Sequence, residues 1–280
     1  MTTPTQIQQA ADLIAQADAL VFSAGAGMGV DSGLPDFRGT NGFWKTFPTH
    51  ANKQMGITEL ATPQTFAQDP ALAWWFYGGR LLSYRRTQPH AGFEILKRWG
   101  ESKHLGSWVF TSNVDGQFQK AGFHDAQIEE CHGSIHHLQC MKPCVPDIWS
   151  ADEFVPAFDE VSGKLIGPLP LCPHCGALAR PNILMFSDYD FVDDRTQAQR
   201  KRRLEWLERV KFTGAKLVVI ELGAGTVIPT VRHFSDQLTR NYGASIIRIN
   251  PDDAQVWRGR HVGLAMPALN ALLCMDDLRS

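Results

Sequence analysis

The sequence predicts an α/β fold in which a doubly wound parallel sheet carries helices on both faces. Short apolar segments alternate along the chain with longer segments of helical periodicity, which is the pattern of a parallel sheet. Two of the apolar segments run directly into Gly-Ala-Gly, and residues 134–180 break the alternation with cysteine pairs and prolines. We therefore expect a Rossmann-like sheet domain with a smaller module at 134–180 and a helical insertion after the first strand.

Four apolar segments predict buried strands, at residues 19–24, 107–111, 215–222 and 245–249. The first continues into Gly25-Ala26-Gly27, and the third continues into Gly223-Ala224-Gly225. In open parallel sheets, ligands bind beyond the carboxyl ends of the strands, where these loops lie. The two loops therefore mark the expected ligand site.

Helical periodicity occupies the segments between the strands, at 4–17, 66–86, 90–99, 198–211, 228–241 and 266–274. Residues 40–90 are too many for one crossover, so this stretch is expected to hold an insertion. We assign 1–40, 91–133 and 181–280 to the sheet domain, 41–90 to the helical insertion and 134–180 to the module. The basic run Arg200–Arg203, with Arg195 and Arg209 nearby, is expected to form a solvated helix face.

The composition excludes several classes of protein. The chain has 280 residues, which suits about two domains, or one large domain with an insertion, at ~150 residues per domain. With 44% hydrophobic and 20% charged residues it is not a disordered chain, and its net charge of −2 excludes binding dominated by nucleic-acid phosphates. Apolar stretches fall short of the ~18 residues of a spanning helix, and the N-terminus lacks a signal-peptide pattern. We therefore expect a cytoplasmic protein without a membrane partner.

Four of the six cysteines form two close pairs, Cys140-x3-Cys144 and Cys172-x2-Cys175, separated by 27 residues. Disulfides are rare in the cytoplasm, and two such pairs can place four thiolates tetrahedrally around one Zn²⁺. Because all four ligands are cysteine, the zinc is expected to be structural, with no open position for catalysis. His174 lies within the second pair and is expected to be a bystander. Residues 134–180 are therefore predicted to be a zinc-binding module.

In the loop after the first strand, the second half gives the more specific sequence signal of function. Gly25 and Gly27 allow a tight turn and a close backbone approach to a pyrophosphate, whose oxygens amide N–H groups can bind. Val30 stands where the third glycine of a G-x-G-x-x-G motif would be, so this half alone is a weak signal. The segment Gly33–Arg38 (GLPDFR) then places an acid, an aromatic ring and a guanidinium beside the expected phosphates.

Motifs along the chain resemble, in order, those of the sirtuin (Sir2) family. The GAG…SGLPDFRG segment (25–39) resembles the family's NAD-binding signature, and TSNVDGQFQKAG (111–122) resembles its TQNID motif. CHGS (131–134) resembles the catalytic His-Gly motif, and the cysteine pairs follow it as in the family's zinc module. RPNILMF (180–186) and IRINPDD (247–253) resemble later segments, so the likeness runs collinearly over about residues 20–275.

The resemblance implies an enzyme that consumes NAD to remove acyl groups from lysine in protein substrates. Nicotinamide leaves the ribose, the acyl oxygen attacks the same carbon, and a base deprotonates a ribose hydroxyl that attacks the resulting imidate. The products are free lysine, nicotinamide and O-acyl-ADP-ribose. By motif, His132 is the general base, since the ordinary pKa of histidine lies near neutrality. Asn113 would orient ribose hydroxyls or a water, Asp115 would bind the carboxamide, and Phe37 would exclude water.

The resemblance also implies the residues that bind the two substrates. Those that contact NAD would be Gly25, Ala26, Gly27, Asp36, Phe37, Arg38, Ser112, Asn113, Asp115, Gly223, Ala224, Gly225 and Asn250, the last on the adenosine ribose. Those that contact the acylated lysine and its peptide would be Tyr77, Arg80 and Phe186.

A second, more specific resemblance concerns the acyl group that would be removed. Residues 59–80 resemble the helical insertion of sirtuins that remove acidic acyl groups such as succinyl, which carry Tyr-x-x-Arg. Tyr77 and Arg80 share a helix face, and a phenol beside a guanidinium can bind a carboxylate. The alternative is that Trp74–Tyr77 pack in the core while Arg80 lies at the surface. The sequence thus allows a deacetylase, a desuccinylase or a demalonylase.

The chain departs from the family pattern at four places. Ser112 replaces a glutamine, and Gly29 replaces a serine of the first loop. Residues 223–226 (GAGT) replace GTS, which removes hydroxyls expected near the NAD phosphates. The alternative is that the Thr226 hydroxyl substitutes for them. Residues 186–188 (FSD) replace FGE, beside the position where a peptide would add as a strand.

These departures keep two other functions open. The first alternative is an NAD-dependent protein ADP-ribosyltransferase or NAD hydrolase on the same fold, in which a protein nucleophile or water intercepts the reaction. The second is an NAD-binding module without catalysis, against which the intact reacting centre argues. The oligomeric state and the protein substrate are left undetermined.

Overall fold

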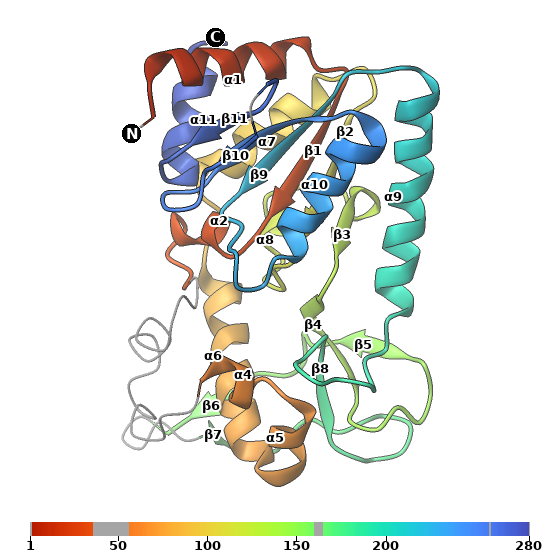
Figure 1. The fold of residues 1–280 in the computed structure, drawn as a ribbon. Coiled ribbons are helices and arrows are strands. Elements are labelled where there is room, and N and C mark those ends of the chain that lie inside the picture. Colours follow the sequence, from red (N-terminus) through yellow and green to blue (C-terminus); the bar gives the residue numbers. More distant parts are fainter. Residues whose placement is uncertain (1, 36–55, 160–164, 258, 280) are drawn as a thin grey trace.

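The computed structural model describes residues 2–35, 56–159, 165–257 and 259–279 (Figure 1). The described chain forms two units, a parallel sheet covered by helices and a smaller unit below it in the figure. Both chain ends lie in the larger unit, where the first helix packs against the last. Among the described residues, no helix is both long and apolar enough to cross a bilayer.

The larger unit is built on a six-stranded sheet with the order β11-β10-β9-β1-β2-β3, and every pair of neighbours is parallel. The strands are β1 (Ala19–Ala24), β2 (Ser107–Thr111), β3 (Ile128–Glu130), β9 (Leu217–Leu222), β10 (Ser245–Ile249) and β11 (Val262–Leu264). The four predicted strands are confirmed. The edge strands β3 and β11 escaped prediction because three residues carry too little periodicity.

Helices cover both faces of this sheet, which confirms the predicted fold class. One face packs against α1 (Pro4–Gln16), α7 (Ala91–Glu101) and α11 (Ala268–Asp277). The other packs against α9 (Asp194–Phe212) and α10 (Thr230–Tyr242). Short helices α2 (Gly27–Val30) and α8 (Gln117–Lys120) and the turn η2 (Asp125–Gln127) lie in the connecting loops. The five long helices here match predicted segments.

The smaller unit combines helices with short antiparallel strands. Its helices are α4 (Ile57–Leu60), α5 (Pro63–Gln68) and α6 (Pro70–Arg86). Its strands are β4 (Gly133–Cys140), β5 (Ile148–Ser150) and β8 (Ala179–Ile183), in the order β5-β4-β8, and the hairpin of β6 (Ala157–Phe158) and β7 (Leu165–Ile166). The predicted helix 66–86 is two helices, because Asp69 accepts a hydrogen bond from the Leu72 N–H (2.9 Å) and starts α6 anew.

The helical insertion and the cysteine-bearing segment share one hydrophobic core. Phe66, Trp74 and Tyr77 from the insertion pack with Ile135 and Leu138 of β4. The indole N–H of Trp74 also donates to the backbone carbonyl of Ala179 in β8 at 3.0 Å. The two segments, expected as separate additions, are therefore packed together as one body.

The expectation of a fully solvated basic face on α9 is wrong for two residues. Arg203 is only 8% exposed, pairs with Glu129 of β3 and lies 4.8 Å over the ring of Phe234. Arg195 pairs with Glu130, the next residue of the same strand. Sequence periodicity missed these ion pairs because the acids lie on a short edge strand far away in the chain. Arg200, Lys201, Arg202 and Arg209 are exposed as expected.

Candidate active site and metal centre

The two glycine-rich loops meet at the carboxyl ends of neighbouring strands β1 and β9. The Gly27 N–H donates to the Gly223 carbonyl at 3.0 Å. A Cβ on Gly27 would lie 2.7 Å from the Cα of Gly223, and one on Gly25 would lie 2.9 Å from the Cα of Ala224. Glycine at 25 and 27 is thus required by loop-to-loop packing, a reason that the motif did not reveal. Contact of these residues with a pyrophosphate stays a prediction.

Asn113 ties the end of β2 to the first glycine loop. Its side-chain Nδ2 donates to the Gly25 carbonyl at 3.0 Å, and its backbone N–H donates to the Thr111 hydroxyl at 3.0 Å. That hydroxyl in turn donates to the Ala24 carbonyl at 3.0 Å. Two motif segments that are far apart in the sequence, 24–25 and 111–113, are therefore held together, which fixes the half-buried Asn113 beside the loop.

His132 lies in the loop after β3, close to the start of α10. Its ring hydrogen-bonds to the Ser112 backbone, and its Nε2 lies 3.5 Å from the Thr230 hydroxyl. Burial lowers the pKa of the imidazole below its ordinary 6.5. A histidine in this state is neutral at pH 7 and can accept a proton, as a general base must.

Asp115 is buried in the loop between β2 and α8. Its Oδ1 accepts a hydrogen bond from the Gln117 N–H at 2.9 Å, and its backbone carbonyl is 3.0 Å from the His136 Nε2. Burial raises the pKa of this carboxyl to about 6, although the nearby Arg80 guanidinium acts in the opposite direction. The raised pKa of Asp115 and the lowered pKa of His132 are shifts of the kind common at catalytic sites.

Tyr77 and Arg80 lie one turn apart on α6. Tyr77 is 1% exposed, and burial raises the pKa of its hydroxyl to about 12. The Arg80 guanidinium lies 5.1 Å, 5.6 Å and 5.4 Å from the ring centroids of Phe76, Tyr77 and Tyr84, and its Nε donates to the Tyr84 hydroxyl at 3.0 Å. The aromatic run is core, as the alternative expected, while Arg80 is half-buried among the rings.

The FSD segment after β8 contains an ion pair that the sequence did not indicate. Asp188 accepts two hydrogen bonds from the Arg180 guanidinium, at 2.6 Å and 2.9 Å, and neither side chain is exposed. Ser187 adopts a positive φ of 54°, which turns the chain so that Asp188 can reach inward. Phe186, the predicted substrate contact, is half-buried, and its N–H donates to the Ala61 carbonyl at 3.0 Å. Asp36, Phe37 and Arg38 lie outside the described residues.

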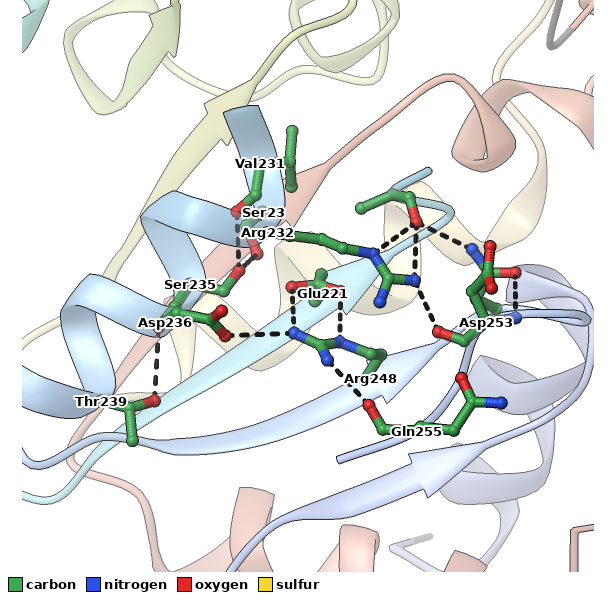
Figure 2. Close-up of polar contacts among 12 residues, drawn as sticks. Ser23, Glu221, Val231, Arg232, Ser235, Asp236, Thr239, Arg248, Asp253 and Gln255 are labelled. Atoms are coloured by element: carbon green, nitrogen blue, oxygen red, sulfur yellow. Dashed lines mark hydrogen bonds and ion pairs between the residues drawn. The ribbon is translucent and has the colours of Figure 1, made fainter. Parts of the chain in front are cut away.

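Asn250 bonds to the Gly223–Gly225 loop, and Figure 2 shows a second polar network around Glu221 and Arg248. Asn250 is 1% exposed, and its Nδ2 donates to the Ala224 carbonyl at 2.9 Å. Beside it, Arg248 of β10 makes a two-bond ion pair with Glu221 of β9, at 2.6 Å and 3.2 Å. These two residues are direct neighbours in the strand register, which sequence reasoning could not supply.

The four paired cysteines form the predicted metal centre. Their sulfur atoms lie within 4.8 Å of one another, with Cys140 to Cys175 at 3.6 Å and Cys144 to Cys172 at 3.7 Å. A tetrahedral Zn²⁺ with Zn–S bonds of about 2.3 Å needs sulfur separations of about 3.8 Å, so the arrangement fits zinc. His174 points instead to Asp147, at 3.3 Å, which agrees with its expected role as a bystander.

Comparison with known proteins agrees with this architecture. The chain is 31% identical to "NAD-dependent protein deacylase 1" of Archaeoglobus fulgidus over 86% of this chain and 84% of that protein. It is 34% identical to "NAD-dependent protein deacylase" of Thermococcus kodakarensis over 64% of this chain and 63% of that protein. A solved Sir2 homolog–NAD complex superposes with a TM-score of 0.70 at 25% identity, over 97% of this chain and 93% of that chain. The Sir2 family model matches residues 25–219, and the chain belongs to the Sir2 family.

Proposed function

We propose that this protein is an NAD-dependent protein-lysine deacylase that releases nicotinamide and O-acyl-ADP-ribose. Two relatives named NAD-dependent protein deacylases and a Sir2 homolog solved with NAD support the class of reaction. The observation that carries the proposal is His132, half-buried and with a lowered pKa, at the sheet edge where Asn113 and the glycine loops meet. NAD would supply an electrophilic ribose carbon once nicotinamide departs.

Each residue of the proposed site would have a separate role in the reaction. His132 would take a proton from a ribose hydroxyl, since its imidazole is neutral at pH 7. Asn113, whose Nδ2 is committed to Gly25, would present its amide oxygen to ribose hydroxyls or a water. Asp115 would bind the carboxamide of nicotinamide. The N–H groups of Ala26, Ala224 and Gly225 would bind the phosphates, since those of Gly25, Gly27 and Gly223 already donate to backbone carbonyls. Ser112, Asp36, Phe37, Arg38 and Asn250 complete the proposed NAD contacts.

We propose that the acyl group is recognised at Tyr77 and Arg80. Arg80 is half-buried among three aromatic rings, which hold its guanidinium beside Tyr77, where it can pair with a carboxylate. This supports acidic acyl groups, succinyl or malonyl, in addition to acetyl. Phe186 would border the groove into which the substrate peptide adds as a strand.

The remaining assignments concern organisation and location. We propose 1–40, 91–133 and 181–280 as the NAD-binding domain, 41–90 as the helical insertion and 134–180 as the zinc-binding module. Zinc would be structural, since its four proposed ligands are all thiolates. A cytoplasmic location is proposed from the same cysteines, because metal-binding thiolates need a reducing compartment.

A second candidate function is ADP-ribosyl transfer to protein or NAD hydrolysis. It is favoured by one observation, that Asp188 of the altered FSD segment is consumed in a buried ion pair beside the proposed peptide groove. The test is to incubate the protein with NAD and matched acetyl-lysine and succinyl-lysine peptides, and to quantify nicotinamide and freed lysine. Deacylation predicts equal amounts of the two. Nicotinamide in large excess over freed lysine would instead support transfer or hydrolysis.

A further inference from the structure

The carbonyl of Ala224 is the acceptor of three hydrogen bonds. Arg232, in the first turn of α10, donates to it through Nε at 3.2 Å and Nη2 at 3.0 Å, and Asn250 donates through Nδ2 at 2.9 Å (Figure 2). The same Arg232 Nη2 also donates to the Asp253 carbonyl at 2.5 Å. A single guanidinium therefore joins the loop after β9 to the loop after β10.

The position of Arg232 is unfavourable for the helix itself. A cation in the first turn of a helix faces the positive end of the helix dipole, which is unfavourable. Burial lowers the pKa of the Arg232 guanidinium from its ordinary value, and Arg248 acts in the same direction, while Glu221, Asp253 and Asp236 oppose the shift. The stability of α10 therefore does not explain the position of Arg232, whereas its hydrogen bonds to the Ala224 and Asp253 carbonyls do.

The contact fixes the direction of one peptide group. In a trans peptide the C=O and the N–H of the same unit point in opposite directions. Since the Ala224 carbonyl points to Arg232 and Asn250, the Gly225 N–H points away from them. In the described part of the chain this N–H donates no hydrogen bond, and a Cβ on Gly225 would meet nothing within 4 Å. The Gly225 N–H is therefore without an acceptor in the described part of the chain, beside a position with open space.

We infer that Arg232 is a positioning residue that holds the Gly225 N–H ready to bind the diphosphate-ribose portion of NAD, an inference that rests on the proposed use of NAD. The loop here is GAGT, which lacks the hydroxyls of the GTS sequence at its second and third positions. A backbone N–H fixed by a guanidinium supplies the donor that these hydroxyls would give. Arg232 acts through the peptide group and does not itself touch the ligand.

The test measures binding of ADP-ribose, which lacks nicotinamide and needs no turnover, by calorimetry on the full chain. Arg232→Met and Gly225→Pro, which removes the N–H, should each weaken ADP-ribose binding by about tenfold or more. The double variant should lose no more than the stronger single variant. Nicotinamide alone, which lacks the ribose and the diphosphate, should bind all variants alike. Arg240→Met, on the exposed last turn of α10, is the control and should bind ADP-ribose like the parent protein.

Arg232→Lys separates positioning from simple charge. A lysine keeps the charge but cannot bridge two carbonyls with a planar fork, so it should weaken ADP-ribose binding nearly as much as methionine. Where the parent protein deacylates, the KM for NAD should rise in both variants with kcat within about twofold. Full affinity in Arg232→Lys, unchanged affinity in every variant, or no ADP-ribose binding by the parent protein would each overturn the inference. ADP-ribose binding that depends on Arg232 in a protein without deacylase activity would overturn the proposed function alone.

Discussion

The backbone of Gly27 rests directly on that of Gly223, with the Gly27 N–H donating to the Gly223 carbonyl at 3.0 Å. The two residues follow strands that are adjacent in the sheet but about two hundred positions apart in the chain. Because the order of the strands runs outward in both directions from β1 and β9, this contact marks the switch point at which open α/β sheets bind ligands. The geometry of the proposed NAD site therefore depends on two backbones that lie too close for a side chain.

Gly27→Ala should disturb this contact. A Cβ would lie 2.7 Å from the Gly223 Cα, so the loops must separate, at a cost of roughly 1–3 kcal/mol in the free energy of unfolding. Denaturant unfolding should show a lower free energy of unfolding, and the KM for NAD should rise. Gly56→Ala is the matched control, since its Cβ would meet only the Thr58 hydroxyl at 3.7 Å. Parent-like stability and KM in Gly27→Ala would show that the contact is unimportant.

His132→Ala should lower kcat by about 10²–10⁴-fold with little change in NAD binding, because a general base contributes that much to a rate. Burial lowers the pKa of His132, so the base remains neutral down to pH values below 6.5, and kcat/KM should fall only below that pH. The pH–rate profile checks this. Asp115→Asn is the control. If kcat/KM still falls at low pH in this variant, the fall belongs to His132. If the fall disappears, it belongs to Asp115.

Asp115 should make the protein less stable at higher pH. The pKa of its carboxyl is about 6 in the folded protein against an ordinary 3.8, so the folded state binds the proton more tightly. The stability that this proton gives is complete below pH 3.8 and is lost as the pH rises through 6. Asp115→Asn should therefore be more stable than the parent protein above pH 6, by roughly 1–3 kcal/mol, and similar to it near pH 4. A stability difference independent of pH would contradict this assignment.

Removal of zinc should unfold the smaller unit. The purified protein should contain one zinc per chain, and Cys172→Ser should lose the metal together with much of the protein's stability, because Cys172 is buried in the cluster. Elemental analysis and thermal unfolding measure both effects. Cys274→Ser, at a half-buried cysteine of α11 outside the cluster, should keep the full zinc content. A fully stable chelated protein would argue against a structural metal.

Arg80→Met should change the choice of acyl group. If the guanidinium binds a carboxylate, kcat/KM for a succinyl-lysine peptide should fall by about 10–100-fold while that for the acetyl-lysine peptide changes little. Arg86→Met, at the exposed end of the same helix, controls for the loss of a surface charge. An unchanged ratio of succinyl to acetyl activity would assign Arg80 to packing among its aromatic neighbours.

Local sequence patterns predicted most of the fold and the metal centre. The features that were missed depend on contacts between separate elements of the fold. The strands at 19–24, 107–111 and 245–249 were predicted within their observed bounds, and the cysteine spacing predicted the cluster that the structure forms. The Arg203–Glu129 and Arg180–Asp188 ion pairs were missed, because each depends on how separate elements dock. The Arg232 contact with Ala224 was missed for the same reason: a helix side chain reaches a carbonyl that no motif identifies.

The most direct test of the proposed function is identification by mass spectrometry of the ADP-ribose product formed from NAD and an acyl-lysine peptide. The account predicts O-acyl-ADP-ribose together with the deacylated peptide, and neither product with His132→Ala. ADP-ribosylated protein or free ADP-ribose beside an intact acyl peptide would contradict it, and would make transfer or hydrolysis the reaction of this site.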